Sequence, residues 1–216
     1  MLKIKQFVFG PFAVNTYIVY DPDTHEAIVV DPGMCDGREQ RVFDKYIDDN
    51  KLKITHIVNT HMHIDHCLGD NYVRYRYGAK VHAHMDDAFL GEGLTEQAKM
   101  FGLNTPDTSP VYINVPLREG DIIKVGKSGL EVIHIPGHSP GSIALYCRES
   151  NFAIVGDILF RGSMGRTDLP GGDFESLVRG IRRKLMPLPS STLVLPGHDM
   201  STTIGQEKAA NPYLHN

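Results

Sequence analysis

The stretch "THMHIDH", residues 60–66, places three histidines and one aspartate within seven positions. Such histidines would repel one another if charged, and they would be costly to bury without partners. A metal ion removes both problems, because neutral imidazole and carboxylate groups are good ligands for zinc, iron and manganese. The stretch therefore predicts a metal site.

The spacing within this stretch suggests two metals. His61 and His63 are two residues apart, which in an extended chain puts both side chains on one side. Asp65 and His66 follow where the chain turns, so we expect them to face a different position. The pattern is typical of a pair of ions rather than a single one.

Four apolar strands lead into residues of metal-binding type. "THIVNT" runs into His61, "LEVIHIPG" into His138, "FAIVG" into Asp157 and "TLVLPG" into His198. Ligands of open α/β sheets bind at the carboxyl ends of strands, so strands laid side by side would bring these residues together. The remaining histidines (His25, His56, His82, His84, His134 and His215) are expected to be structural, as is Cys67.

Strand and helix patterns alternate along the chain. Strands are expected near 2–9, 15–21, 26–31, 54–60, 80–84, 121–125, 130–135, 142–147, 152–157 and 192–197. Helices are expected at 36–50, opened by a capping box of Asp36 and Glu39, and at 67–77, 173–185 and 205–214. The segment 86–117 is weakly helical and then loop-like, as in an active-site lid. The pattern indicates an α/β layered fold whose opening hairpins exclude a purely parallel sheet.

Composition narrows the possible functions. The chain has 216 residues, a formal net charge of −4 and no apolar run as long as a membrane-spanning helix. We therefore expect neither nucleic acid nor membrane as a partner. Three well-separated cysteines (Cys35, Cys67 and Cys147) indicate a reducing, cytoplasmic location without disulfides.

The motifs "THMHIDH", "PGHSPGS", "VGD" and "PGH", in this order, resemble those of the metallo-β-lactamase superfamily, and within it the glyoxalase II-like (hydroxyacylglutathione hydrolase-like) enzymes. The resemblance implies a four-layer αββα sandwich with two mixed sheets and a dinuclear centre at one edge. We expect one such domain over 1–216 that ends in a short C-terminal helix and lacks the separate helical substrate domain that glyoxalase II-like enzymes commonly carry. The resemblance also implies a ligand set: His61, His63 and His138 for one metal, Asp65, His66 and His198 for the other, and Asp157 between them.

Two divalent ions roughly 3.5–4 Å apart can bind one bridging water and make hydroxide near neutral pH, which can attack a thioester or ester carbonyl. Asp65 would orient that hydroxide. A thiolate has a pKa of roughly 8.5 and leaves without a strong general acid. An amide nitrogen needs protonation, and the sequence offers no separate acid for it. The expected activity is therefore hydrolysis of a small-molecule thioester such as S-lactoylglutathione, with two divalent ions, most simply zinc, as cofactors.

Substrate recognition is expected from the segment after Asp157, "ILFRGSMGRTDLPGGD", which must pass near the metals. Arg166 and Arg161 are candidate partners for a substrate carboxylate, because arginine forms bidentate pairs with carboxylates. The glyoxalase II-like enzymes often carry lysine and aromatic residues where this chain has "GRTD".

Three alternatives stay open from the sequence. "GRTD" and "PGHD" also resemble persulfide dioxygenases, which use one iron held at positions matching His61, His138 and Asp157. A lactonase, lactamase, phosphodiesterase or other ester hydrolase would use the same ligands. A binding protein with a vestigial site is a third class, although every ligand position carries a competent residue.

Overall fold

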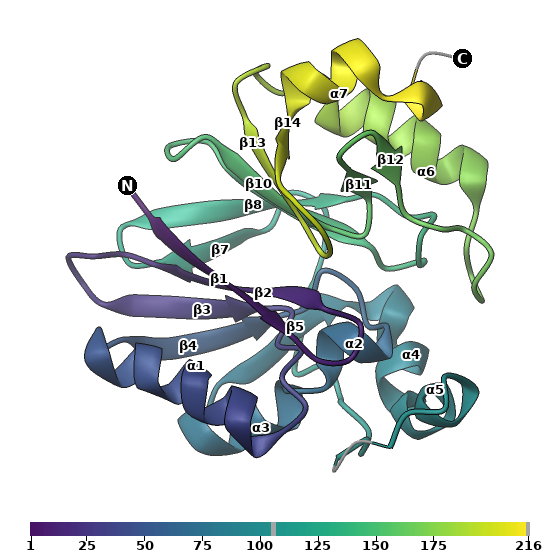
Figure 1. Ribbon diagram of the computed structural model, residues 1–216. Helices are drawn as coiled ribbons and strands as arrows, with labels where there is room; N and C mark the ends of the chain where they lie inside the picture. The colour runs from purple at the N-terminus through teal and green to yellow at the C-terminus, as the bar shows by residue number, and fades with distance from the viewer. Residues whose placement is uncertain (105–106, 215–216) are drawn as a thin grey trace.

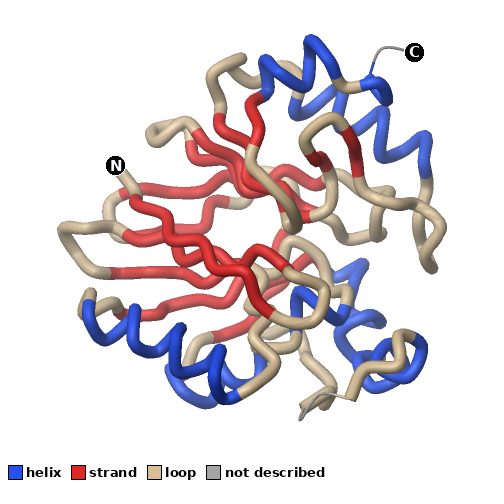
Figure 2. The backbone as a smooth tube through the Cα atoms, in the orientation of Figure 1, coloured by secondary structure: helices blue, strands red, loops and turns tan. Residues whose placement is uncertain are grey.

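The computed structural model describes residues 1–104 and 107–214, and in this part of the chain two six-stranded sheets lie face to face (Figures 1 and 2). His215 and residues 105–106 of the expected lid lie outside the described residues. The first sheet comes from the first half of the chain and the second sheet from the second half.

The first sheet has the order β1-β2-β3-β4-β5-β6. Its strands are β1 (Lys3–Phe9), β2 (Val14–Tyr20), β3 (Glu26–Val30), β4 (Lys53–Val58), β5 (Lys80–His84) and β6 (Val115–Leu117). The first three pair antiparallel, and β3 to β6 pair parallel. The carboxyl ends of β3, β4 and β5 therefore point to the same edge of the sheet.

The second sheet has the order β14-β13-β10-β9-β8-β7. Its strands are β7 (Ile122–Val125), β8 (Ser128–His134), β9 (Ile143–Cys147), β10 (Phe152–Gly156), β13 (Leu193–Pro196) and β14 (Thr202–Thr203). Only β10 and β13 pair parallel, so both sheets are mixed, as expected. A small hairpin of β11 (Leu159–Phe160) and β12 (Ser163–Met164) follows β10.

Helices cover the outer face of each sheet, which gives the four layers αββα (Figure 1). On the first sheet lie α1 (Gly37–Asp49), α2 (Ile64–Cys67), α3 (Asp70–Tyr77), η1 (Met85–Asp87), α4 (Ala88–Glu92) and α5 (Leu94–Met100). On the second lie α6 (Phe174–Gly180), η2 (Ile181–Leu185), α7 (Ile204–Ala210) and η3 (Pro212–Leu214). None of the described helices combines the length and apolarity needed to cross a membrane.

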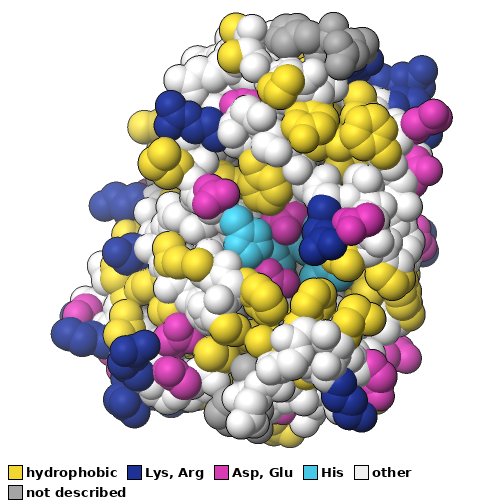
Figure 3. All heavy atoms as spheres, turned by 45° about the vertical axis from the view of Figure 1, so that its right-hand side comes forward, with side chains coloured by type: hydrophobic (Ala, Val, Ile, Leu, Met, Phe, Trp, Pro, Cys, Tyr) yellow, Lys and Arg dark blue, Asp and Glu magenta, His cyan; other side chains and the backbone are white. Residues whose placement is uncertain are grey.

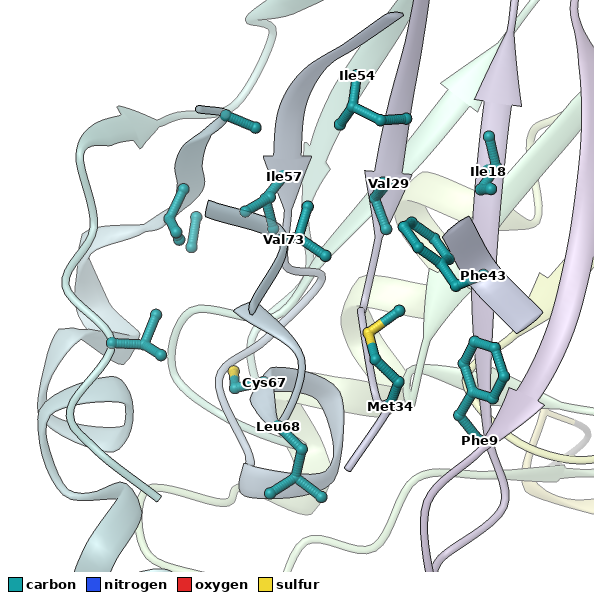
Figure 4. Packing of buried hydrophobic residues seen from close by; sticks show 14 of the residues in the cluster. Phe9, Ile18, Val29, Met34, Phe43, Ile54, Ile57, Cys67, Leu68 and Val73 are labelled. Atoms are coloured by element: carbon teal, nitrogen blue, oxygen red, sulfur yellow. The ribbon is translucent and has the colours of Figure 1, made fainter. Parts of the chain in front are cut away.

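Three apolar clusters hold these layers together. One lies between the first sheet and its helices, where Phe43 of α1 packs toward Val29 and Ile18 (Figure 4). A second fills the space between the two sheets, and a third lies under α6 and η2. Full burial of one such side chain contributes about 1.5–3 kcal/mol, so the packed layers fix the strand ends that carry the polar residues. Cys35, Cys67 and Cys147 are free thiols.

The structure differs from the expected elements in short pieces. The helix expected at 67–77 begins only at Asp70, as α3, and the short helix α2 ends at Cys67 before it. Strand β6 lies in the segment expected as loop. Of the two reciprocal hydrogen bonds expected for the capping box, the one from Asp36 forms and the one from Glu39 does not. Asp36 accepts from the N–H groups of Arg38 and Glu39, but the Glu39 carboxylate accepts from Gly10 and Cys35, which lie outside the helix and need acceptors.

Candidate metal centre

The predicted ligands come from loops and one helix that begin where strands end. After β4, the chain bends at Thr60 and His61 and is extended at His63, and Asp65 and His66 lie in the short helix α2. His138, Asp157 and His198 follow β8, β10 and β13 of the other sheet. Both halves of the chain therefore meet at this point.

Three imidazole nitrogens converge in the first cluster. Nδ1 of His63 lies 2.9 Å from Nε2 of His138, and that atom lies 3.2 Å from Nε2 of His61. Two nitrogens bound to one tetrahedral zinc at 2.0–2.1 Å lie roughly 3.3–3.4 Å apart. The three nitrogens are therefore spaced as ligands of a single ion.

The second cluster joins a carboxylate to two imidazoles. Oδ2 of Asp65 lies 3.1 Å from Nε2 of His198 and 3.5 Å from Nε2 of His66. The ligand-type atoms of these three residues all lie within 4.8 Å of one another. His66 is also grouped with His61 of the first cluster and with Asp157 within the same distance, so the two clusters adjoin each other.

Asp157 faces both clusters. Its Oδ1 is 3.5 Å from Nε2 of His66, while Oδ2 is 3.6 Å from Nε2 of His138 and 3.6 Å from Nε2 of His198. Oδ1 of Asp157 and Nε2 of His66 are buried and have no hydrogen-bond partner among the described residues. Buried polar atoms without a partner are costly, so the centre is incomplete without a further group.

Hydrogen bonds on the far side of the rings fix which nitrogens face the centre. Nδ1 of His138 donates to the carbonyl oxygen of Arg166 at 2.8 Å, and Nδ1 of His198 donates to that of Phe12 at 3.1 Å. A carbonyl can only accept, so Nε2 of each ring keeps its lone pair for a metal. Such outer contacts are typical of metal-binding histidines.

Asp31 supports the same centre and escaped the sequence analysis. It follows β3, accepts hydrogen bonds from N and Oγ1 of Thr60 at 2.7 and 2.6 Å, and has its Oδ2 3.0 Å from Nδ1 of His66. The stretch "EAIVVD" shows the same pattern as the ligand-bearing strands, because it is an apolar strand that ends in an acidic residue. Asp31 lies behind a ligand rather than beside the metals, which the strand pattern does not reveal.

Asp87, in η1, is the second supporting residue that the sequence analysis missed. Its carboxylate accepts from N of Met62 at 3.1 Å, from Oγ of Ser139 at 2.7 Å and from N of Gly141 at 2.6 Å. Met62 lies between two predicted ligands, and Ser139 follows His138. Asp87 therefore ties the two ligand-bearing loops together, and no local sequence signal marks it.

Two glycines leave room for the ligands. A Cβ on Gly197 would lie 2.2 Å from Oδ1 of Asp157 and 2.7 Å from Cε1 of His66. A Cβ on Gly165 would lie 3.1 Å from Nδ1 of His138. The close approach of these side chains therefore requires glycine at position 197 of "VLPGH" and at position 165 of "SMGRT".

Charge is divided unevenly across the centre. Burial, together with the neighbouring histidines, lowers the pKa of His61 well below its ordinary value and that of His63 to about 3. Burial opposes the charging of His66 as well, but Asp65 and Asp31 outweigh it and raise its pKa well above the ordinary value. His61 and His63 are thus neutral ligands, and the second cluster holds acidic groups that call for a cation.

A cavity of about 230 Å³ opens above these side chains. Histidine and acidic side chains gather in the middle of this face, with hydrophobic side chains around them (Figure 3). The cavity is lined by Phe12, His63, Asp65, Phe101, His138, Asp157, Arg166, Leu169 and His198. Arg166 is thus at the cavity, whereas Arg161 is exposed in the turn between β11 and β12 and does not line it.

The donor set fits divalent metal ions. Imidazole and carboxylate groups lie at separations that suit ligands of zinc, iron or manganese. Among the described residues, some of their buried atoms have no hydrogen-bond partner, which a metal ion would supply. His61, His63 and His138 would hold one ion, Asp65, His66 and His198 the other, and Asp157 would contact both.

A sequence profile described as the metallo-beta-lactamase superfamily matches residues 9–198. The chain belongs to the metallo-beta-lactamase superfamily. Hydroxyacylglutathione hydrolase GloC of Haemophilus influenzae, a curated relative, is 37% identical over 99% of both chains. The superfamily fold implies divalent-metal binding and a metallohydrolase class for this chain.

Solved structures of this superfamily superimpose closely on the chain. The BLEG-1 B3 metallo-beta-lactamase has a TM-score of 0.89 at 33% identity, covering 99% of this chain and all of its own. TTHA1623 in a di-iron-bound form has a TM-score of 0.85 at 36% identity, covering 97% of this chain and all of its own. The predicted four-layer sandwich with two mixed sheets is therefore confirmed.

Proposed function

We propose that this protein hydrolyses a small-molecule thioester of the S-lactoylglutathione type. The observation that carries the proposal is the composition of the cavity wall. Every side chain there that can gain or lose a proton near neutral pH is one of the proposed metal ligands, and the others are Arg166 and three apolar residues. A substrate cleaved here must therefore carry a leaving group that departs without a dedicated acid.

A thioester meets this requirement. The thiol that it releases has a pKa of roughly 8.5, so the sulfur can leave as a thiolate near neutral pH without being protonated. An amide nitrogen cannot leave without protonation. The 37% identity to hydroxyacylglutathione hydrolase GloC over nearly the whole chain supports the same reading.

The proposed ligands are His61, His63, Asp65, His66, His138, Asp157 and His198. When bound, two divalent ions, of which zinc is our choice over iron and manganese, would lower the pKa of a water molecule and polarise the substrate carbonyl. Asp65 is the proposed catalytic carboxylate, because its side chain is fixed by His198 and can accept a hydrogen bond from the attacking water.

The remaining cavity wall is suited to a substrate with an apolar part and a carboxylate. Phe12 and Phe101 meet edge to face with ring centroids 5.7 Å apart, and Leu169 lines the same cavity. Arg166 supplies the positive charge and is the proposed carboxylate anchor. Arg161 remains a second, more distant proposal for the same role. The free thiols fit a reducing compartment such as the cytoplasm.

The test combines metal content with four substrates, namely S-lactoylglutathione, glutathione persulfide, a β-lactam and a lactone. Protein purified without added zinc is analysed for metal and assayed for thiol release from S-lactoylglutathione. We expect about two metal ions per chain and thiol release that is lost in Asp65→Asn. Metal content near two without turnover of any thioester would overturn the thioester assignment while leaving the metal centre in place.

The other three substrates address the alternatives. One iron per chain with oxygen uptake on glutathione persulfide would instead identify a persulfide dioxygenase. Cleavage of a β-lactam or lactone without thioester turnover would identify the lactamase or lactonase alternative, which the similarity to the BLEG-1 enzyme brings into the comparison.

A further inference from the structure

A second group of ligand-type side chains lies at another place where the two sheets meet. His84 ends β5 of the first sheet, Asp86 follows it in η1, and His134 ends β8 of the second sheet. The two imidazole rings are nearly parallel, with an interplanar angle of 12° and centroids 3.9 Å apart. We propose that His84, Asp86 and His134 form a further binding site for a zinc-type divalent ion, outside the metal centre described above.

The spacing of these groups suits one ion. The ligand-type atoms of the three residues lie within 4.8 Å of one another, and Nδ1 of His84 is 3.6 Å from Oδ2 of Asp86. Two atoms bound to one tetrahedral zinc are roughly 3.3–3.4 Å apart. Because the lone pairs of two parallel rings lie in separate planes, one ring must tilt out of the stack to share an ion. Nδ1 of His84 must also exchange the hydrogen bond that it accepts from N of Asp86 at 3.3 Å for the ion, unless the other ring nitrogen binds it.

His134 is already oriented for this role. Its Nε2 donates to the carbonyl oxygen of Pro140 at 2.9 Å, because that oxygen can only accept. Nδ1 of the same ring therefore keeps its lone pair. The arrangement repeats what His138 and His198 show in the metal centre, where a carbonyl behind the ring leaves the other nitrogen for a metal.

Exposure and charge support a site that exchanges with solvent. The His84 side chain is 14% exposed, whereas the Asp86 side chain is 58% exposed, so an ion could enter from the Asp86 side and keep water ligands. Burial, followed by the nearby His134, lowers the pKa of His84, which keeps this imidazole neutral and able to bind near neutral pH. Arg118 acts on His84 in the same direction, and its charge opposes a cation there.

Stacking of two neutral imidazoles without any metal is the competing explanation, and zinc stoichiometry separates the two. Wild type and His84→Phe are dialysed to equilibrium against the same buffered free zinc, and bound zinc per chain is measured by elemental analysis. Phenylalanine keeps a planar ring in the stack but removes the ligand nitrogen. We expect the wild type to bind one zinc ion more than His84→Phe, with hydrolase activity retained in both.

The matched control is His56→Phe. His56 and His82 also form a ring pair, with centroids 4.5 Å apart, but no third ligand-type residue is grouped with them among the described residues. This control should bind as much zinc as the wild type. Equal zinc in wild type, His84→Phe and control would show that the rings only stack, and would overturn the proposal.

If His84→Phe folds poorly, substitutions at two exposed residues still test the proposed site. Asp86→Ala should weaken the additional zinc binding at least tenfold in a calorimetric titration, because it removes the anionic ligand. Arg118→Gln should strengthen it, because it removes an opposing charge. No change in zinc affinity in either variant would contradict the proposed site.

Discussion

At the scale of single residues, Gly197 illustrates how tightly the centre is built. An alanine methyl group there would fall 2.2 Å from Oδ1 of Asp157. Since the neighbouring Pro196 backbone is paired in the sheet, the carboxylate must move instead. We expect Gly197→Ala to lower metal affinity by about 10–100-fold, the usual cost of disturbing the surroundings of a metal ligand. Bound metal per chain, measured after dialysis, checks this.

The control for Gly197→Ala is Gly37→Ala in the first turn of α1. A Cβ at Gly37 would meet only the flexible end of the Arg41 side chain, at 3.4 Å. Gly37→Ala should therefore keep the full metal content. Retention of both metals by Gly197→Ala would show that Asp157 does not occupy the bridging position.

Arg166 allows a substrate role to be separated from a structural one. Its guanidinium forms two hydrogen bonds of 2.7 Å to the Asp168 carboxylate, and this exposed pair contributes little to stability. The contact with His138 uses the Arg166 backbone oxygen, so a side-chain substitution leaves it intact. Arg166→Ala should raise KM for a carboxylate-bearing thioester more than it lowers kcat.

Arg166→Lys and an uncharged substrate provide the comparison for that prediction. Lysine keeps the charge but not the planar pair of donors, so KM should lie between those of wild type and Arg166→Ala. A thioester without a carboxylate should show no change in KM in either variant. An unchanged KM for the carboxylate substrate in Arg166→Ala would dismiss the anchor role.

At the scale of elements, η1 matters because of Asp87. Its buried carboxylate accepts three hydrogen bonds from the two ligand-bearing loops. Asparagine at this position would turn an amide N–H toward another donor, at a cost of about 1–3 kcal/mol. We expect Asp87→Asn to lower the free energy of unfolding in urea by that amount and to reduce bound metal.

Asp36→Asn is the control for Asp87→Asn, because it makes the same substitution at another carboxylate that accepts backbone hydrogen bonds. Asp36 accepts from the N–H groups at the start of α1, and asparagine caps helices as well as aspartate does. Its unfolding free energy and metal content should stay close to those of the wild type. If Asp87→Asn behaves like Asp36→Asn, the loops are fixed by other contacts.

The helices and strands that could be predicted are those long enough to show a periodic pattern of apolar residues. The strands flanking the centre are apolar runs that end in histidine or aspartate, and the ends of β4, β8, β10 and β13 lie where this pattern put them. Strands β6, β11, β12 and β14 have two or three residues each, too few for any alternation. Contacts such as Asp87 with Ser139 join distant segments, and no local pattern encodes them.

At the scale of the whole molecule, the centre joins the two halves of the sandwich. Four of the proposed ligands come from the segment after β4 and three from loops of the second sheet. The apolar clusters already hold the layers together, so the fold does not depend on metal alone. Bound ions would add stability because the unfolded chain does not present the ligands together.

Removal of metal should therefore lower the melting temperature without abolishing the fold. At an ion concentration of 100 times Kd, one site adds about 2.7 kcal/mol, which for a chain of this size corresponds to roughly 5–11 °C. Thermal unfolding with and without chelator measures the difference, and circular dichroism checks that the metal-free chain stays folded. The experiment is repeated in His84→Phe, so that the shift reports on the metal centre alone.

A double variant, His61→Ala with His198→Ala, removes one ligand from each cluster and should show little response to chelator. Equal melting temperatures for the wild type with and without chelator would contradict a metal that links the two halves.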